Sequence, residues 1–125
     1  VTSVSMEPPT LLVCVNSSAS MHDKLVSSGK FCANVLSPGD QEVASAFSDP
    51  EKRTERFQYG DWGALVTGSP SLRTAQVSFD CRIVQTVRVG THTICIGEIV
   101  TAECPVGDVS PLIYSDGRYG EVAAI

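Results

Sequence analysis

Two apolar runs, separated by a cluster of small hydroxyl residues, constrain the fold of this chain more than any other feature. Residues 10–15 are apolar enough for a buried strand, and the run stops abruptly at residues 16–20, which read Asn-Ser-Ser-Ala-Ser. A second apolar run, residues 31–36, holds one amide side chain, Asn34. We therefore expect two strands with one short helix between them.

The hydroxyl cluster, residues 16–20, lies where that helix is expected to begin. Ser20 and Asp23 have the spacing of a capping box, and Gly29 suits the left-handed residue that closes a helix ending near Ser28. Helix starts carry unpaired N–H groups and the positive end of the helix dipole, so they favour phosphates and other anions. The alternative is an ordinary serine-rich turn capped at Ser20, and the residues alone favour that alternative.

Local signals place further elements around these two strands. Residues 1–5 predict a short strand, and Pro8-Pro9 a stiff extended joint. The sequence Ser37-Pro38-Gly39-Asp40 repeats the helix-start signal and precedes an amphipathic stripe over residues 43–47. Residues 49–57 predict a short helical turn or loop, and residues 60–71 an irregular surface excursion.

Strands dominate the second half of the chain. Alternating apolar side chains predict a long strand over residues 74–89, broken at Gly90 and followed by an antiparallel strand over residues 91–101. Residues 111–114 and 119–122 close the chain. The whole pattern favours a mainly β fold, a small antiparallel barrel with peripheral helices.

Length and charge exclude several classes of protein. The 125 residues are typical of one domain, spanning residues 1–125. A net charge of −5 argues against nucleic-acid binding, because no basic stripe is present to contact phosphates. No signal peptide is present, and the longest apolar run is far below the roughly 18 residues of a membrane helix.

The cysteines give no metal or disulfide pattern. Their number is five, which is odd, and no Cys-x-x-Cys pair occurs. They predict small buried side chains in a reducing cytoplasm. With two histidines, His22 and His92, the chain offers few metal ligands, and we expect no metal.

An ordered set of short motifs resembles one family over nearly all of the chain. The set comprises Ser3-Val4-Ser5, Pro8-Pro9, the hydroxyl cluster, Phe31-x-x-Asn34-x-Leu36-Ser37, Gln41, Phe47, Arg56-Phe57 before Trp62, Gly68-x-Pro70-x-Leu72, Gly90-Thr91-His92, Gly97-Glu98 and Gly117-Arg118-Tyr119. In this order and spacing they are similar to the short-chain flavin reductases of two-component monooxygenases. Within that group the chain is most similar to the reductases that serve 4-hydroxyphenylacetate 3-monooxygenase.

The resemblance implies a fold and an activity. The implied fold is an antiparallel, Greek-key-like split β-barrel of the FMN-binding type, forming a homodimer with flavin near the subunit interface. The implied protein is a cytoplasmic enzyme that takes hydride from NADH or NADPH, reduces FMN or FAD, and supplies reduced flavin to a separate monooxygenase. Family members carry a further helix and strand before the position of Val1, ending in a Thr-Ala-Asn-like segment that contacts the flavin. The cofactors carry this chemistry, and the protein supplies position and electronics.

The resemblance assigns the hydroxyl cluster to the flavin phosphate. Ser17, Ser18, Ala19 and Ser20 resemble a cradle in which small residues let backbone N–H groups approach and hydroxyls add donors. Asn16 is either a turn residue or a ligand.

Two other segments are expected beside the flavin ring. Cys32-Ala33-Asn34 resembles the strand whose backbone lies along the isoalloxazine; the commoner alternative is that Asn34 is a polar side chain satisfied by main chain. Thr2 and Ser3 border the preceding segment and resemble contacts to the ring or the ribityl chain. Their alternative is plain strand.

The residues expected to contact the nicotinamide are Gly90-Thr91-His92. This resembles the Gly-x-His motif that lies against NAD(P)H in the family, with His92 as the expected catalytic residue; a lone histidine at a strand start is otherwise more often structural. Tyr119 either covers the same pocket or packs the closing strand. Arg56 either binds the adenosine phosphates of NADH or belongs to a solvated charge run.

Two other functions stay open at this point. A flavin-binding electron-transfer protein of the same fold would bind flavin without NAD(P)H turnover. A related barrel enzyme would reduce a corrinoid through bound flavin. The Gly90-Thr91-His92 motif favours the reductase over both.

Overall fold

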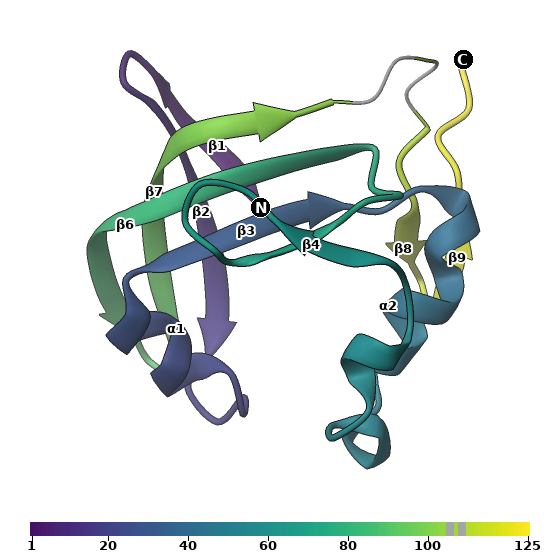
Figure 1. Cartoon of the computed structure of the whole chain (residues 1–125), viewed down its shortest axis with the longest axis horizontal. Helices are drawn as coiled ribbons and strands as arrows, with labels where there is room; N and C mark the ends of the chain where they lie inside the picture. The colour runs from purple at the N-terminus through teal and green to yellow at the C-terminus, as the bar shows by residue number, and fades with distance from the viewer. Residues whose placement is uncertain (105–106, 108–109) are drawn as a thin grey trace. The chain divides into compact units, whose positions relative to one another are not determined.

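The structure is a computed structural model that describes all residues except 105–106 and 108–109 (Figure 1). Its strands are β1 (Thr2–Met6), β2 (Pro9–Asn16), β3 (Lys30–Val35), β4 (Trp62–Ala64), β5 (Pro70–Leu72), β6 (Val77–Val89), β7 (His92–Glu103), β8 (Ile113–Ser115) and β9 (Arg118–Gly120). Its helices are α1 (His22–Ser28) and α2 (Gln41–Ser48), with single 3₁₀ turns at Pro38–Asp40, Pro50–Lys52 and Arg56–Gln58. The prediction of a mainly β fold with peripheral helices is confirmed.

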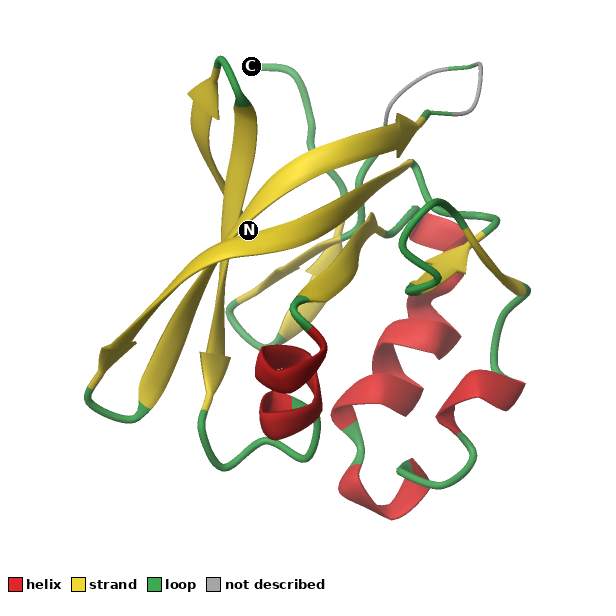
Figure 2. Cartoon of the chain, turned by 60° about the vertical axis from the view of Figure 1, so that its left-hand side comes forward, coloured by secondary structure: helices red, strands yellow, loops and turns green. Residues whose placement is uncertain are grey.

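The largest sheet holds five strands in the order β1-β2-β7-β6-β3, drawn as the long yellow arrows of Figure 2. Strand β2 is antiparallel to both β1 and β7. Only Gly90 and Thr91 separate β6 from β7, so these two strands form a hairpin. Gly90 has a φ of 57°, in the left-handed region that glycine tolerates best, and the predicted strand break at this residue is confirmed.

The chain forms two compact units, which we describe separately. The first comprises Val1–Ala33, Ala64–Pro70 and Phe79–Ala102. Its core joins Leu11, Leu25, Phe31, Ala33, Cys81 and Cys95. Gly97 lies against this core, because a Cβ there would stand 2.7 Å from Phe31 Cζ and 2.9 Å from Cys81 Cβ. No larger residue fits at this position without a shift of the core.

The second unit comprises Asn34–Gly63, Ser71–Ser78 and Glu103–Ile125. Its described core packs Val43, Leu72 and Ala75 against Leu36, Phe47, Tyr59 and Trp62. The predicted helix start is confirmed as a capping box. The Asp40 Oδ2 atom accepts from Ser37 N at 2.9 Å and from Ser37 Oγ at 2.8 Å.

Two predictions for the first third of the chain were wrong. Helix α1 has Met21 as its N-cap, with no side-chain cap bond, because the Asp23 carboxylate contacts the His22 ring and not the helix start. Pro8-Pro9 is not an extended joint: β1 and β2 pair, with Met6 opposite Pro9, so Glu7 and Pro8 form a tight hairpin turn. The predicted helix end at Gly29 is confirmed, with a φ of 69°.

The segment predicted as a surface excursion, residues 60–71, was also misjudged. It contains β4 and β5, and its Thr67 and Ser69 are buried. Asp80 explains the burial of Thr67. It is fully buried on β6, and its carboxylate accepts from Thr67 N at 2.7 Å and from Thr67 Oγ1 at 2.5 Å. Cys81, the next residue and so on the opposite face of the strand, is also fully buried. This part of β6 is therefore covered on both faces, and its polar residues do not mark solvent.

The cysteines divide by environment. Cys81 and Cys95 are buried as predicted, whereas Cys14 and Cys104 are exposed, contrary to the prediction. Cys14 is exposed because β2 alternates between covered and open positions after its buried start at Thr10 and Leu11. Among the described residues, no helix is long and apolar enough to cross a membrane.

Candidate functional site

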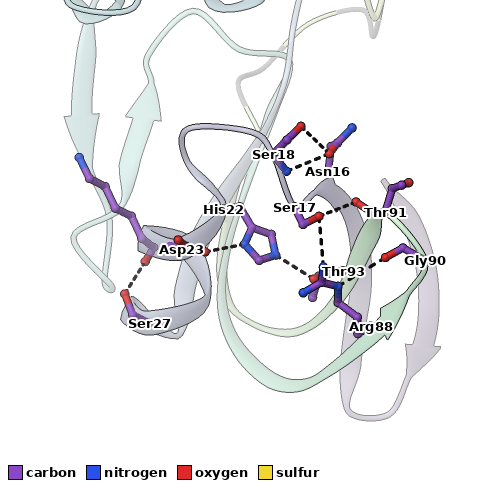
Figure 3. Close-up of polar contacts among 11 residues, drawn as sticks. Asn16, Ser17, Ser18, His22, Asp23, Ser27, Arg88, Gly90, Thr91 and Thr93 are labelled. Carbon is purple, nitrogen blue, oxygen red and sulfur yellow. Dashed lines mark hydrogen bonds and ion pairs between the residues drawn. The ribbon is translucent and has the colours of Figure 1, made fainter.

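The hydroxyl cluster and the Gly90-Thr91-His92 motif lie together in the first unit (Figure 3). Strand β2 ends at Asn16, whose partner across the sheet is His92. The next residue, Ser17, donates twice to the carbonyl of Thr91, from its backbone N at 2.8 Å and from its Oγ at 2.9 Å. Two segments predicted to serve different cofactors are thereby joined, although Ser17 and Thr91 are 74 positions apart in sequence.

The side chain of Asn16 organises the turn that follows β2. Its Oδ1 accepts from Ser18 N at 2.9 Å and from Ser18 Oγ at 2.8 Å, and its carbonyl accepts from Ala19 N at 2.9 Å. These bonds are those of a turn residue, one of the two roles expected for Asn16. Ser18 and Ser20 are exposed, and Ser17 is half-buried.

Arg88, near the end of β6, is a member of this cluster that the sequence analysis missed. Its Nη2 lies 3.4 Å from Ser17 Oγ, and its Nε lies 3.5 Å from the carbonyl of Gly90. Within the described part of the chain, no carboxylate lies within 4.0 Å of its guanidinium. An exposed cation with no acidic partner therefore stands beside the serine hydroxyls.

His22, the second residue that the sequence analysis passed over, lies beneath the same turn. Its side chain is buried, with Nε2 at 2.8 Å from Thr93 Oγ1 and Nδ1 at 2.9 Å from Asp23 Oδ1 (Figure 3). A carboxylate only accepts, so the neutral ring carries its proton on Nδ1, and Nε2 accepts from the Thr93 hydroxyl. The backbone N of His22 donates to the carbonyl of Ala19 at 3.1 Å.

His92, the predicted catalytic residue, is exposed at the start of β7. The hydroxyl of Thr91 lies 2.8 Å from its Nδ1 and fixes the ring on one side. A Cβ on Gly90 would meet nothing within 4 Å in the chain, so its backbone conformation is sufficient to explain the glycine. Close approach of Gly90 to a ligand stays a prediction.

The residues predicted beside the flavin ring lie on β1 and β3. Thr2 and Ser3 are exposed on β1, the edge strand of the sheet. Cys32 and Ala33 lie on β3, where Ala33 belongs to the core of the first unit.

Asn34, the third residue of that predicted segment, belongs to the second unit. Its Oδ1 accepts from Leu72 N at 3.0 Å and from Ser78 Oγ at 2.8 Å. This is the environment of a satisfied polar side chain, the structural alternative for Asn34. A contact with flavin stays a prediction for it and for the residues on β1 and β3.

Arg56 and Tyr119 also belong to the second unit, and each has structural contacts there. The Arg56 guanidinium donates to the carbonyls of Ala46 and Asp49, both at 3.3 Å, and so satisfies carbonyls at the end of α2. Tyr119 pairs with Tyr114 across the β8–β9 hairpin, with ring centroids 5.1 Å apart. Their predicted contacts with nicotinamide nucleotide stay predictions.

The buried cysteines are poor nucleophiles. Burial raises the pKa of the Cys81 thiol to about 12, with smaller contributions from the neighbouring Cys32 and Asp80. Burial likewise raises the pKa of Cys95, with a smaller contribution from Cys14. These shifts favour the neutral thiols and argue against a catalytic role for either residue. Among the described residues, no group of three potential ligands is placed to hold a metal ion.

Comparison with known proteins identifies the family of the chain. The model of the flavin reductase like domain matches residues 1–123. The FMN reductase (NADH) RutF of Variovorax paradoxus (strain S110) is 44% identical over 124 residues, covering 99% of this chain and 68% of that protein. Across the first curated relatives, the chain spans between 58% and 68% of their length.

Solved structures agree with this match. The NADH:FAD oxidoreductase SgcE6 of Streptomyces globisporus C-1027, in complex with NAD and FAD fragments, superposes with a TM-score of 0.89 at 32% identity, covering 98% of this chain and 73% of that one. BorF, the flavin reductase component of a bacterial two-component tryptophan halogenase, gives a TM-score of 0.87 at 31% identity, covering 99% of this chain and 79% of that one. The predicted fold class is confirmed, and the chain belongs to the family of flavin reductase like domains.

Proposed function

We propose that this chain is the catalytic domain of an NADH-dependent flavin reductase that reduces FMN and releases it to a partner enzyme. The family match and the 44% identity to an FMN reductase (NADH) support the proposal. The observation that carries it is the pair of bonds from Ser17 to the Thr91 carbonyl. They join the segment predicted to bind the flavin phosphate to the segment predicted to lie against the nicotinamide.

The donors at this point fit the phosphate of a flavin mononucleotide. In the structure the hydroxyl protons of Ser17 and Ser18 go to the Thr91 carbonyl and to Asn16 Oδ1, so each hydroxyl has to rotate before it donates to a phosphate. Arg88 adds a positive charge with no carboxylate beside it among the described residues. A planar guanidinium and short hydroxyls are the groups that recognise phosphate oxygens in other proteins. Ala19 adds only a methyl group to the turn, and its backbone N donates to the carbonyl of Asn16.

In the proposed reaction the flavin, when bound, accepts hydride and the nicotinamide supplies it. The chain itself holds and orients the flavin and the nicotinamide. Ser17, Ser18 and Arg88 hold the phosphate and so fix one end of the flavin. Thr91 orients His92 through the 2.8 Å contact at Nδ1, which presents the imidazole at the exposed start of β7. No side chain of the site needs to gain or lose a proton for this role.

The remaining parts of the proposal concern partners. A homodimer is supported by exposed apolar side chains on β6, among them Val87 and Val89. A separate monooxygenase as the acceptor of reduced flavin is supported by the likeness to reductase components of two-component systems, such as BorF. That the chain is most similar to the reductases that serve 4-hydroxyphenylacetate 3-monooxygenase, and that the protein is cytoplasmic, stay predictions of the resemblance.

The test is oxidation of NADH by the full-length protein, followed by absorbance with and without FMN, FAD or riboflavin. We expect oxidation to depend on added flavin, to saturate with it, and to favour FMN. Parallel runs with NADPH assign the nicotinamide. A protein that binds flavin and supports no turnover with any of the three would instead be an electron carrier.

A further inference from the structure

We propose that His22 is a positioning residue, which holds the proposed phosphate-binding turn in place by receiving a hydrogen bond from Thr93. The inference rests on the proposed function and names the part of the structure that pre-organises its anion site. Neither residue contacts the proposed phosphate donors through its side chain.

The turn is anchored at one end to the β6–β7 hairpin turn and at the other end to β7. At the first end, Ser17 donates twice to the carbonyl of Thr91. At the second end, the ring of His22 receives the Thr93 hydroxyl at 2.8 Å. The chain therefore leaves β2 after Asn16, contacts the hairpin turn at Thr91, and contacts β7 at Thr93 through His22, six residues after Asn16.

Only the second anchor is buried. Thr93 is 5% exposed and His22 is 8% exposed, and Thr93 lies opposite Val15, the last residue but one of β2. The first anchor lies at the exposed end of the hairpin. Breaking the buried hydrogen bond would leave both His22 Nε2 and Thr93 Oγ1 without a partner, which is costly in free energy. The buried anchor therefore fixes the turn to β7, in addition to the Asn16 bonds that organise the turn itself.

The ring also has its orientation fixed from the other side. Its Nδ1 donates to the carboxylate of Asp23 at 2.9 Å, which selects the tautomer whose Nε2 accepts from Thr93. Its backbone N donates to Ala19, in the middle of the turn. One residue thus connects the turn, helix α1 and strand β7, and the donors on Ser17 and Ser18 depend on that connection for their positions.

The test replaces Thr93, which lies outside the proposed donors. Thr93→Val keeps the shape and removes the hydroxyl, whereas Thr93→Ser keeps the hydroxyl and is the matched control. Dissociation constants for FMN and riboflavin are measured by flavin fluorescence quenching, and KM and kcat by NADH oxidation. Riboflavin lacks the phosphate, so a change in phosphate positioning affects FMN alone.

We expect Thr93→Val to weaken FMN binding about fivefold or more, to leave riboflavin within about twofold, and to leave kcat at saturating flavin unchanged. Thr93→Ser should behave as wild type. Equal weakening of both flavins, or no change in either, would overturn the inference. So would a wild-type protein that binds FMN no more tightly than riboflavin.

A second variant covers the case in which Thr93→Val does not fold. The double substitution His22→Leu with Thr93→Val replaces both partners by apolar groups, a change that is often nearly neutral for stability. It lacks the anchor and should show the same FMN-selective loss; wild-type affinity for FMN in this variant contradicts the proposal. If wild-type protein does not oxidise NADH, the proposed function fails, and the binding comparison still tests the anchor.

Discussion

Substituting Arg88 by alanine should weaken FMN binding without affecting riboflavin. The guanidinium lies 3.4 Å from Ser17 Oγ, beside the proposed phosphate donors, and is exposed. Its contacts in the chain are long and go to uncharged oxygens, so the substitution removes little that stabilises the fold. What it removes is the positive charge that we propose faces a bound phosphate.

The size of the effect follows from this exposure. A charge-assisted hydrogen bond contributes about 1.5 to 3 kcal/mol, and exposed ion pairs contribute about 1 kcal/mol or less. An exposed arginine on a phosphate dianion falls between these values, at about 1 to 2 kcal/mol. This corresponds to a rise of about five- to thirtyfold in the dissociation constant for FMN.

The assay is a flavin fluorescence titration with FMN and riboflavin at low and high salt. Arg82→Ala is the matched control, because Arg82 is also exposed on β6 and lies six residues away, about 20 Å along the strand. Screening should reduce the FMN preference of wild type more than that of Arg88→Ala. Equal effects of the two substitutions, or equal loss of FMN and riboflavin, would refute the assignment of Arg88 to the phosphate.

Three further predictions concern catalysis, packing and the thiols. His92→Ala should slow flavin reduction by NADH roughly tenfold in stopped-flow measurements while FMN affinity is retained; an unchanged rate contradicts the role of His92. Gly97→Ala should lower the free energy of unfolding by about 1 to 3 kcal/mol, because its Cβ clashes with the core. Gly90→Ala should lower it by about 1 kcal/mol through backbone strain alone. Denaturant melts in which Gly90→Ala loses more stability than Gly97→Ala contradict this. A thiol reagent at mildly alkaline pH should label Cys14 in the native protein and spare Cys81. Because the pKa of the Cys81 thiol is raised from 9.0 to about 12 in the folded protein, this thiol contributes its full stabilisation below pH 9.0. The contribution is lost progressively as the pH rises to about 12. Cys81→Ala should therefore flatten the alkaline loss of stability.

Local chemistry was enough to predict much of the fold. Gly29 and Gly90 mark a helix end and a hairpin because only a small set of backbone conformations fits those positions, and glycine is the residue that adopts them. The capping box of Ser37 and Asp40 acts over three residues and can be read directly. The ordered motifs identified the family because they span nearly the whole chain.

Side chains with several possible hydrogen-bond partners were predicted less well. Asp23 was expected to reach back to Ser20, but it bonds to the ring of the adjacent His22, which burial against Thr93 holds in place. Residues 60–71 were expected to form a surface excursion, whereas Thr67 in this segment is buried and donates to the buried Asp80 on β6. In both cases a contact with a residue distant in sequence decided the outcome.

The sequence by itself determined most of the element types, the family, and the residues proposed to bind the flavin phosphate. Tertiary structure alone decided which of those residues meet. The contact of Ser17 with Thr91, the place of Arg88 beside them and the burial of His22 on Thr93 all depend on the pairing of β2 with β7. That pairing joins residues more than seventy positions apart. It is fixed by the burial of the core around Leu11 and Cys95, and the hydrophobic effect that drives this burial is not directional, so no local pattern records it.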